Sequence, residues 1–200
     1  MNTLVDNLKR AVRDLKELNL KFALIGGFAV SFHTSPRTTE DIDFILLAKN
    51  NAEIENLVRS LHSKDYKLIN LFENTAKKKV SLVRLLSPNC EGPNPNLDLL
   101  FNITGIEQEI VSEAIHYNYL EIDAPIASIA CLIAMKLVSE NEERLTDRQD
   151  LISLIKISDK KTILRARELS ILIANRGYSG GKDLNSRLDH FVERTKKTLD

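Results

Sequence analysis

Two aspartates at the start of an apolar strand constrain this chain more than any other feature. Residues 24–47 read LIGGFAVSFHTSPRTTEDIDFILL, so one apolar strand runs into a Gly-Gly pair and a second opens with Asp41 and Asp43. Side chains two positions apart on a strand share a face, roughly 7 Å from each other. Charges at the mouth of a buried strand cost stability unless they are compensated, so the stretch predicts a cation site.

A third carboxylate, Asp98, lies in a separate apolar segment, residues 96–101. If the strand formed there neighbours the strand of Asp41, three carboxylates converge and repel one another. A pair of Mg²⁺ (or Mn²⁺) ions would relieve this repulsion, because hard divalent cations take oxygen ligands and bridge phosphates. Two such ions can activate a hydroxyl and stabilise a leaving pyrophosphate. Asp41, Asp43 and Asp98 are therefore candidate catalytic residues and metal ligands.

The Gly26-Gly27 pair fits the same chemistry. A backbone without Cβ atoms can approach a triphosphate closely, and the start of a helix favours anions. Alone, a Gly-Gly pair is more typical of an ordinary turn, and Asp-x-Asp alone is also found on surface strands. The order strand, glycines, short helix, Arg37, Thr39, aspartates and strand is the combination that predicts a phosphate site.

Hydrophobic periodicity predicts an α+β fold, in which a small mixed sheet flanked by helices precedes an α-helical carboxy-terminal region. Pro125 fits the first turn of a helix, so we expect a catalytic core at 1–123 and a helical region at 124–200 that completes the cleft. The expected strands are 21–25, 41–47, 66–72, 80–86, 96–101 and 117–122, and the expected helices are 3–19, 29–33, 51–62, 106–115, 126–138, 146–157, 159–175 and 182–198.

Composition excludes several classes of protein. The 28 Lys and Arg residues balance the 28 Asp and Glu residues, so no global charge favours nucleic acid or an anionic membrane. The sequence shows no signal-peptide pattern and no apolar run of about 18 residues, so we expect a cytoplasmic location and no membrane partner. The contexts of Cys90 and Cys131, a Pro/Asn-rich loop and an apolar helix, do not favour a disulfide. Spacing of His and Cys residues does not predict zinc.

These motifs resemble a known family. Gly26-Gly27-x-Ala29 followed by Arg37-x-Thr39-x-Asp41-Ile-Asp43 is similar to the first motif of the polymerase-β-like nucleotidyltransferase superfamily. Within it, the chain resembles the abortive-infection (AbiEii-like) toxin branch, the nucleotidyltransferase partners of type IV toxin–antitoxin systems. That branch adds a Lys-Leu pair on a helix and an Arg-x-x-Asp-x-x-Asp-Leu segment, which here are Lys136-Leu137 and Arg144, Asp147, Asp150 and Leu151. The resemblance spans roughly residues 22–151.

The resemblance implies transfer of a nucleoside monophosphate from an NTP to an acceptor hydroxyl, with Mg²⁺ or Mn²⁺. It implies RNA, particularly the 3′ end of tRNA, as acceptor and a cognate antitoxin as partner. Asp41 and Asp43 would hold metal, Asp98 would activate the acceptor hydroxyl, and Lys136 would contact phosphates. The implied nucleotide-binding set is completed by Gly26, Gly27, Arg37, Thr39, Asp147 and Asp150. Phe28 departs from the superfamily, in which a phosphate-holding serine often follows the glycine.

Other interpretations stay open at this point. The acceptor could be a small molecule or a protein side chain, or the chain could be a catalytically silent binding or antitoxin member. The presence of all three carboxylates argues against a catalytically silent protein, because unpaired buried charges cost stability. Lys136 could extend its ammonium group to the surface, and Arg144, Asp147 and Asp150 stand at the spacing of a surface salt bridge. His33 is more typical of a packed or exposed residue than of a catalytic one.

Overall fold

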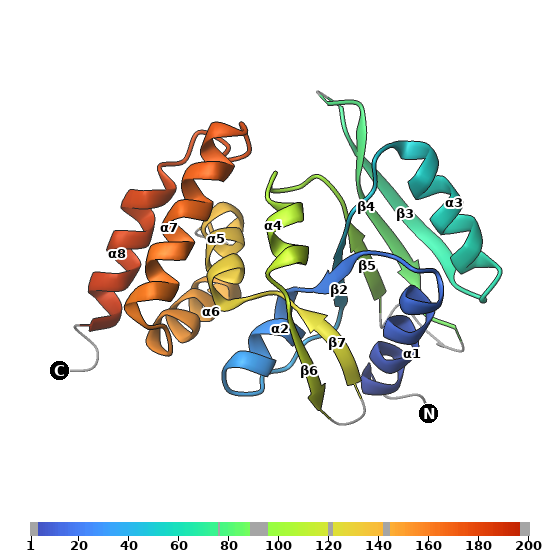
Figure 1. The fold of residues 1–200 in the computed structure, drawn as a ribbon, viewed down its shortest axis with the longest axis horizontal. Coiled ribbons are helices and arrows are strands. Elements are labelled where there is room, and N and C mark those ends of the chain that lie inside the picture. Colours follow the sequence, from blue (N-terminus) through green and yellow to red (C-terminus); the bar gives the residue numbers. More distant parts are fainter. Residues whose placement is uncertain (1–3, 76, 89–95, 120–121, 142–144, 197–200) are drawn as a thin grey trace.

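The computed structural model of the chain describes residues 4–75, 77–88, 96–119, 122–141 and 145–196. A seven-stranded mixed sheet forms the centre of the amino-terminal part, and a group of helices follows it (Figure 1). The strands lie in the order β3-β4-β5-β2-β1-β7-β6. The elements in chain order are α1 (Leu4–Glu17), β1 (Phe22–Leu24), α2 (Gly26–His33), β2 (Ile42–Leu46), α3 (Asn51–His62), β3 (Lys67–Asn74), β4 (Lys79–Leu86), β5 (Asn96–Leu100), α4 (Glu107–Ser112), β6 (Ile115–Tyr119), β7 (Ile122–Ile126), α5 (Ile129–Ser139), α6 (Leu145–Lys156), α7 (Lys160–Asn175) and α8 (Leu184–Lys196).

The pairing of β2 decides where the site forms. It runs antiparallel to β1 and parallel to β5, with Asp43 directly beside Asp98. On the far side of β5, antiparallel β4 places Arg84 beside Asp98. Partners in a sheet share a face, so these three charged side chains form one row across the sheet. The expectation that the strand of Asp98 neighbours the first aspartate strand is confirmed.

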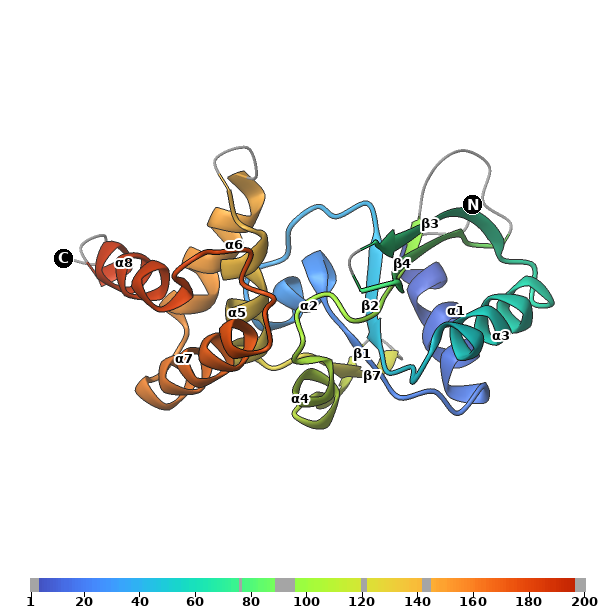
Figure 2. The same ribbon diagram turned by 90° about the horizontal axis from the view of Figure 1, so that it is seen from above.

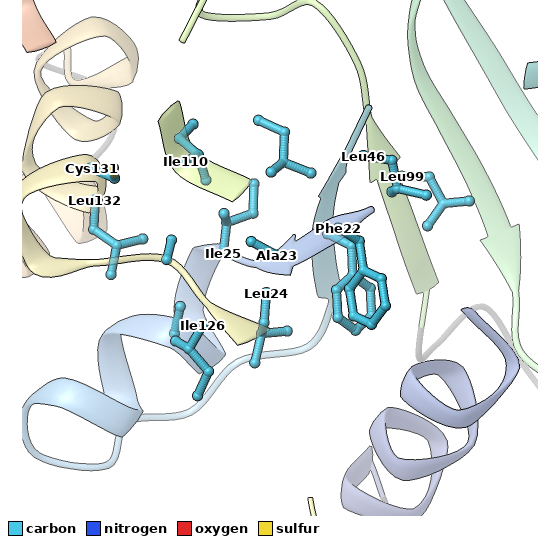
Figure 3. Packing of buried hydrophobic residues seen from close by; sticks show 14 of the residues in the cluster. Phe22, Ala23, Leu24, Ile25, Leu46, Leu99, Ile110, Ile126, Cys131 and Leu132 are labelled. Atoms are coloured by element: carbon cyan, nitrogen blue, oxygen red, sulfur yellow. The ribbon is translucent and has the colours of Figure 1, made fainter. Parts of the chain in front are cut away.

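The central strands are apolar because helices cover both faces of the sheet. Phe22 of β1 packs edge-on against Phe44 of β2, with ring centroids 5.4 Å apart. Figure 3 shows Ile110 of α4 on the other side of β1 from Phe22. Such burial on both faces explains why β1 and β2 read as continuous apolar runs rather than as alternating ones.

The four carboxy-terminal helices pack together at one side of the sheet, with α8 farthest from it (Figure 2). Helix α5 is apolar on most sides because α6, α7 and α8 all contact it. Glu140, which follows α5, is 2% exposed, and its carboxylate contacts Arg148 and Arg187. The Lys182 ammonium donates to the carbonyl of Glu140 at 2.9 Å. These contacts hold the segment from Lys182 to Arg187 against the end of α5.

The structure corrects the predicted elements around Pro125. The strand predicted at 117–122 is a hairpin of β6 and β7, and Pro125 lies in β7 rather than in a helix. The missing proline N–H is tolerated because β7 pairs with β1 beyond it, at Ile126. Helix α5 begins only after Ser128, whose hydroxyl accepts from the Cys131 N–H. The sheet therefore extends past residue 123.

Helix α2 begins at Gly26, three residues before the predicted start, so the glycines form its first turn rather than a preceding loop. Helix α4 ends at Ser112, and Ile115, predicted as its last residue, starts β6. Among the described residues, no helix is long and apolar enough to cross a membrane.

Candidate active site

A cavity of about 640 Å³ opens between the sheet and the helices α5 and α6. Its floor is the start of β2 and the first turn of α2, and its far wall is formed by α5 and α6, which contribute both polar and apolar side chains. Most of the residues predicted from the sequence line it: Gly26, Gly27, Arg37, Thr39, Asp41, Asp43, Lys136 and Asp147. Segments more than 100 residues apart in the sequence thus meet at one site.

Asp98 lies behind this surface, 5% exposed and held by an arginine. Arg84 donates from Nε to Asp98 Oδ1 at 2.8 Å and from Nη2 to Asp98 Oδ2 at 2.6 Å. The same Nη2 lies 3.9 Å from Asp41 Oδ2. Sequence reasoning missed Arg84, although a single arginine in the apolar segment 80–86 was a usable signal. The residue supplies a positive charge at the β4 end of the row, next to Asp98.

The Asp43 carboxyl carries the strongest electrostatic perturbation of the site. Burial raises its pKa to about 7, and the neighbouring charges of Asp98 and Asp41 contribute to this rise. Lys136 and Arg84 act in the opposite direction without cancelling these effects. Burial first, and then the negative charges of two neighbouring carboxylates, disfavour ionisation of Asp43, and a cation beside it would offset the contribution of those charges.

The donor set fits a hard divalent cation such as Mg²⁺. Asp41 and Asp43 present carboxylate oxygens to the cavity from one end of one strand. Among the described residues, no group of three or more acidic, His or Cys side chains is arranged to hold a metal. Arg84 donates to both oxygens of Asp98. Asp41 and Asp43 could therefore hold a metal, and Asp98 is paired with a side-chain cation.

Two glycines let the backbone pass close to these side chains. Gly26 has φ +66°, and a Cβ at this position would lie 2.0 Å from Asp43 Oδ2. A Cβ on Gly27 would lie 2.7 Å from Thr39 Oγ1. Ile25 occupies the N-cap of α2 and provides no side-chain cap. The first N–H groups of α2 are therefore left to face the cavity, where they can bind an anion.

A second charged network joins the loop before β2 to α5 and α6. Arg37 binds Asp150 through two hydrogen bonds of 2.8 Å, and the Lys136 ammonium lies 2.8 Å from Asp150 Oδ2. Lys136 also contacts Asp147. Asp150 is 1% exposed, so the two aspartates of α6 do not form the surface salt bridge considered above. Arg144, the first residue of that motif, lies outside the described residues.

Lys136 does not extend its ammonium group to the surface. Its side chain is 13% exposed and lines the cavity with its charge held by two aspartates. A lysine fixed in this way stands at the position where a phosphate group would compete for it.

Several residues of interest belong elsewhere in the fold. His33 contacts the carbonyl of Ala127 at 2.8 Å, and burial lowers its pKa, so it is a packed residue as expected. Phe28 lines a separate apolar groove together with Tyr117. Cys131 is a buried free thiol on α5, whereas Cys90 lies outside the described residues.

Comparison with known proteins agrees with this geometry. The family described as "Nucleotidyl transferase AbiEii toxin, Type IV TA system" matches residues 10–152. None of the curated proteins matches the chain significantly by sequence.

Three solved structures share the fold at low sequence identity. A nucleotidyltransferase-like protein from Paracoccidioides brasiliensis is 21% identical, with a TM-score of 0.54 over 92% of this chain and 93% of its own. A lincosamide antibiotic adenylyltransferase with bound lincomycin is 16% identical, with a TM-score of 0.54 over 79% of this chain and 100% of its own. A nucleotidyltransferase described as putative, from H. pylori, is 18% identical, with a TM-score of 0.50 over 96% of this chain and 95% of its own.

At these identities the structures show the nucleotidyltransferase fold. The family match covers more than half of the chain and includes both strands that carry the aspartates. The chain therefore belongs to the AbiEii family of nucleotidyltransferase toxins of type IV toxin–antitoxin systems, and it is a nucleotidyltransferase.

Proposed function

We propose that this enzyme transfers a nucleoside monophosphate from an NTP to a hydroxyl of RNA, at the 3′ end of tRNA, in a reaction that depends on Mg²⁺ or Mn²⁺. The observation that carries the proposal is that Asp41 and Asp43 line the cavity beside the open first turn of α2, with Asp98 and Arg84 next to Asp43 in the same row of the sheet. Residues 1–123 would form the catalytic core, and residues 124–200 would complete the cleft. Both substrates occur in the cytoplasm, where we expect the enzyme to act.

Asp41 and Asp43 would hold the metal. When bound, Mg²⁺ supplies positive charge to the phosphates and makes the acceptor hydroxyl more acidic. Asp43 would then ionise fully, because the cation offsets the neighbouring carboxylates that raise its pKa. Its contact with Gly26 fixes the carboxylate beside the phosphate-binding turn.

The phosphates would lie between the first turn of α2 and the far wall of the cavity. N–H groups at Gly26 and Gly27 would donate to phosphate oxygens. Lys136 would exchange part of its contact with Asp147 for a phosphate oxygen, while Arg37 stays bound to the buried carboxylate of Asp150. Arg37 and Thr39 thus position the loop that leads to Asp41.

Asp98 would accept the proton of the attacking hydroxyl. The hydroxyl oxygen then forms a bond to the α-phosphorus, the bond between the α-phosphorus and its bridging oxygen breaks, and pyrophosphate leaves. Arg84 holds both oxygens of Asp98 in this structure. Each oxygen keeps a second lone pair that could accept the proton, and the Arg84 guanidinium, 3.9 Å from Asp41, could shift towards that carboxylate once Asp98 is neutral.

A small-molecule acceptor is the second candidate. The lincosamide adenylyltransferase shows that this fold can hold a drug-sized molecule. In this chain, Ile103, Leu132, Met135 and Val138 give the cavity an apolar side that would suit such an acceptor. A cognate antitoxin, the remaining partner expected for the family, would bind independently of the acceptor.

Incubation with radiolabelled NTPs, Mg²⁺, total tRNA and a cell extract separates these candidates. We expect label in RNA, with a loss of at least about a hundredfold on Asp41→Asn or Asp43→Asn, in line with the removal of a charged transition-state contact. Label in a small molecule or in protein would replace the RNA proposal with the second candidate or with protein modification. Absence of label in every fraction would refute the proposed enzyme activity and favour a silent binding member.

A further inference from the structure

The sheet face that carries the catalytic carboxylates continues beyond the cavity onto the edge strands. Next to the charged row lies an apolar row, in which Leu100 of β5 pairs with Leu82 of β4, and Leu82 pairs with Phe72 of β3. Leu100 lines the cavity. Phe72, at the other end of the row, is 50% exposed. An apolar track therefore leads from the catalytic carboxylates to an exposed aromatic ring.

The two faces of β3 differ in their neighbours. Leu68 and Leu71 face α3, where they line a groove together with Ile54. Phe72 and Asn70 point to the opposite face, because they pair with Leu82 and Arg84 of the active-site side. A β-bulge between Phe72 and Glu73 separates the ring from the acidic side chain, which faces α3. The aromatic ring thus belongs to the active-site face.

The end of the β3–β4 hairpin adds positive charge to this side of the cavity. Lys77, Lys78 and Lys79 are exposed in and after the turn. The Lys77 ammonium lies 3.0 Å from the centroid of the Tyr178 ring, which packs against Gly105, next in sequence to the cavity-lining Thr104. Lys77 therefore stands near the rim of the cavity, and Lys78 and Lys79 follow it as exposed residues of the same hairpin.

An exposed aromatic ring next to basic side chains is the arrangement by which proteins bind single-stranded nucleic acid. Any base can stack on the ring, and lysines attract the phosphate backbone. We propose that the acceptor is a single-stranded RNA end, whose unpaired base stacks on Phe72 while its terminal hydroxyl reaches Asp98 along the Leu82–Leu100 row. This inference rests on the proposed nucleotidyl transfer and assigns its acceptor site.

Binding can be tested without turnover. Fluorescence anisotropy of a short fluorescein-labelled single-stranded RNA with a free 3′ hydroxyl is measured in EDTA for the wild type and for Phe72→Ala. Base–aromatic stacking predicts that Phe72→Ala weakens binding about tenfold or more, whereas Phe72→Tyr stays within about threefold of the wild type. Leu68→Ala is the matched control, because Leu68 is 49% exposed on the same strand but faces α3, and it should leave binding unchanged.

Three outcomes would overturn the inference. They are no measurable RNA binding by the wild type, equal binding by Phe72→Ala, and an equal loss in Leu68→Ala. Size-exclusion chromatography tests a fourth outcome that would overturn it. If the wild type is a dimer and Phe72→Ala is a monomer, the exposed edge strand β3 binds a second copy of the chain and not RNA. Transfer of label is measured separately, so RNA binding through Phe72 without transfer would refute the proposed activity and leave the acceptor surface intact.

Discussion

Replacing Asp43 with asparagine should stabilise the cation-free protein at neutral pH. The pKa of Asp43 is raised from its ordinary value of 3.8 to about 7, first by burial and then by Asp98 and Asp41. Because the folded state holds this proton more tightly than the unfolded state, wild-type stability is fully present below about pH 4 and falls as the pH rises towards 7. Above about pH 7 the loss is complete and the curve is level. The Asp43→Asn variant has no such proton to lose.

The size of the effect follows from the two pKa values. At about 1.4 kcal/mol per pKa unit, the difference between the ordinary and the raised pKa of Asp43 corresponds to a loss of about 4 kcal/mol in the free energy of unfolding. The carboxylate is only partly shielded, because it also faces the cavity. Solvent screening reduces the expected loss to about 1–3 kcal/mol. This remains a substantial fraction of the stability of a typical domain.

Urea unfolding in EDTA, followed by circular dichroism from about pH 4.5 to about pH 8, measures this loss as the difference between the wild type and Asp43→Asn. The difference is needed because His33, with a pKa lowered by burial, makes stability rise with pH below about 6.5 in both proteins. Asp189→Asn is the control, since the Arg167 hydrogen bond lowers the pKa of that exposed carboxylate, away from the range in which Asp43 titrates. Parallel curves for the wild type and Asp43→Asn would refute the reasoning, as would a gain in wild-type stability with rising pH relative to the variant.

Three further substitutions test the scaffold of the site. Gly26→Ala should destabilise the protein by about 2 kcal/mol more than Gly177→Ala, because both have positive φ but only the first Cβ meets an aspartate oxygen; thermal unfolding gives the comparison, and equal losses would contradict it. Glu140→Gln should cost about 2 kcal/mol by weakening a buried contact with two arginines, whereas exposed Glu193→Gln should change stability by less than about 0.5 kcal/mol. Arg84→Met should lower the free energy of unfolding in EDTA by about 3 kcal/mol, because it leaves the buried Asp98 carboxylate without its partner. Mg²⁺ should recover part of this loss in a melting assay. An unchanged melting temperature in the variant would refute the pairing.

Much of the fold could be predicted because its signals are local. Apolar periodicity located α3 at Asn51–His62 and the hairpin of β3 and β4 within two residues. The prediction failed at Pro125, where local chemistry favours a helix start but a sheet position next to β1 supplies enough pairing at Ile126 to keep the strand extended. Tertiary pairing overrode a local preference there.

The residues of the candidate site also fall into two groups, those that local sequence could predict and those that depend on tertiary pairing. Gly26, Asp41 and Asp43 could be recognised from their spacing within one short segment. The pairing of Asp98 with Arg84 depends on the register of two strands, which no local pattern specifies. The distinction between a surface salt bridge and a buried network likewise depends on how α6 packs against the loop before β2, a contact between residues 113 positions apart.

Charge balance in this network explains why the site should receive its cation before its nucleotide. When all are ionised, the five aspartates exceed the three cationic side chains by two charges, and the proton that Asp43 holds near neutral pH only reduces this excess, so the protein alone offers no net attraction to a triphosphate. A divalent cation at the carboxylate row removes the excess, and it also removes the reason for the raised pKa of Asp43. Lys136 can then exchange Asp147 for a phosphate oxygen while Arg37 keeps the buried Asp150 carboxylate paired. The groups concerned are Asp41, Asp43, Asp98, Asp147 and Asp150 with Arg37, Arg84 and Lys136.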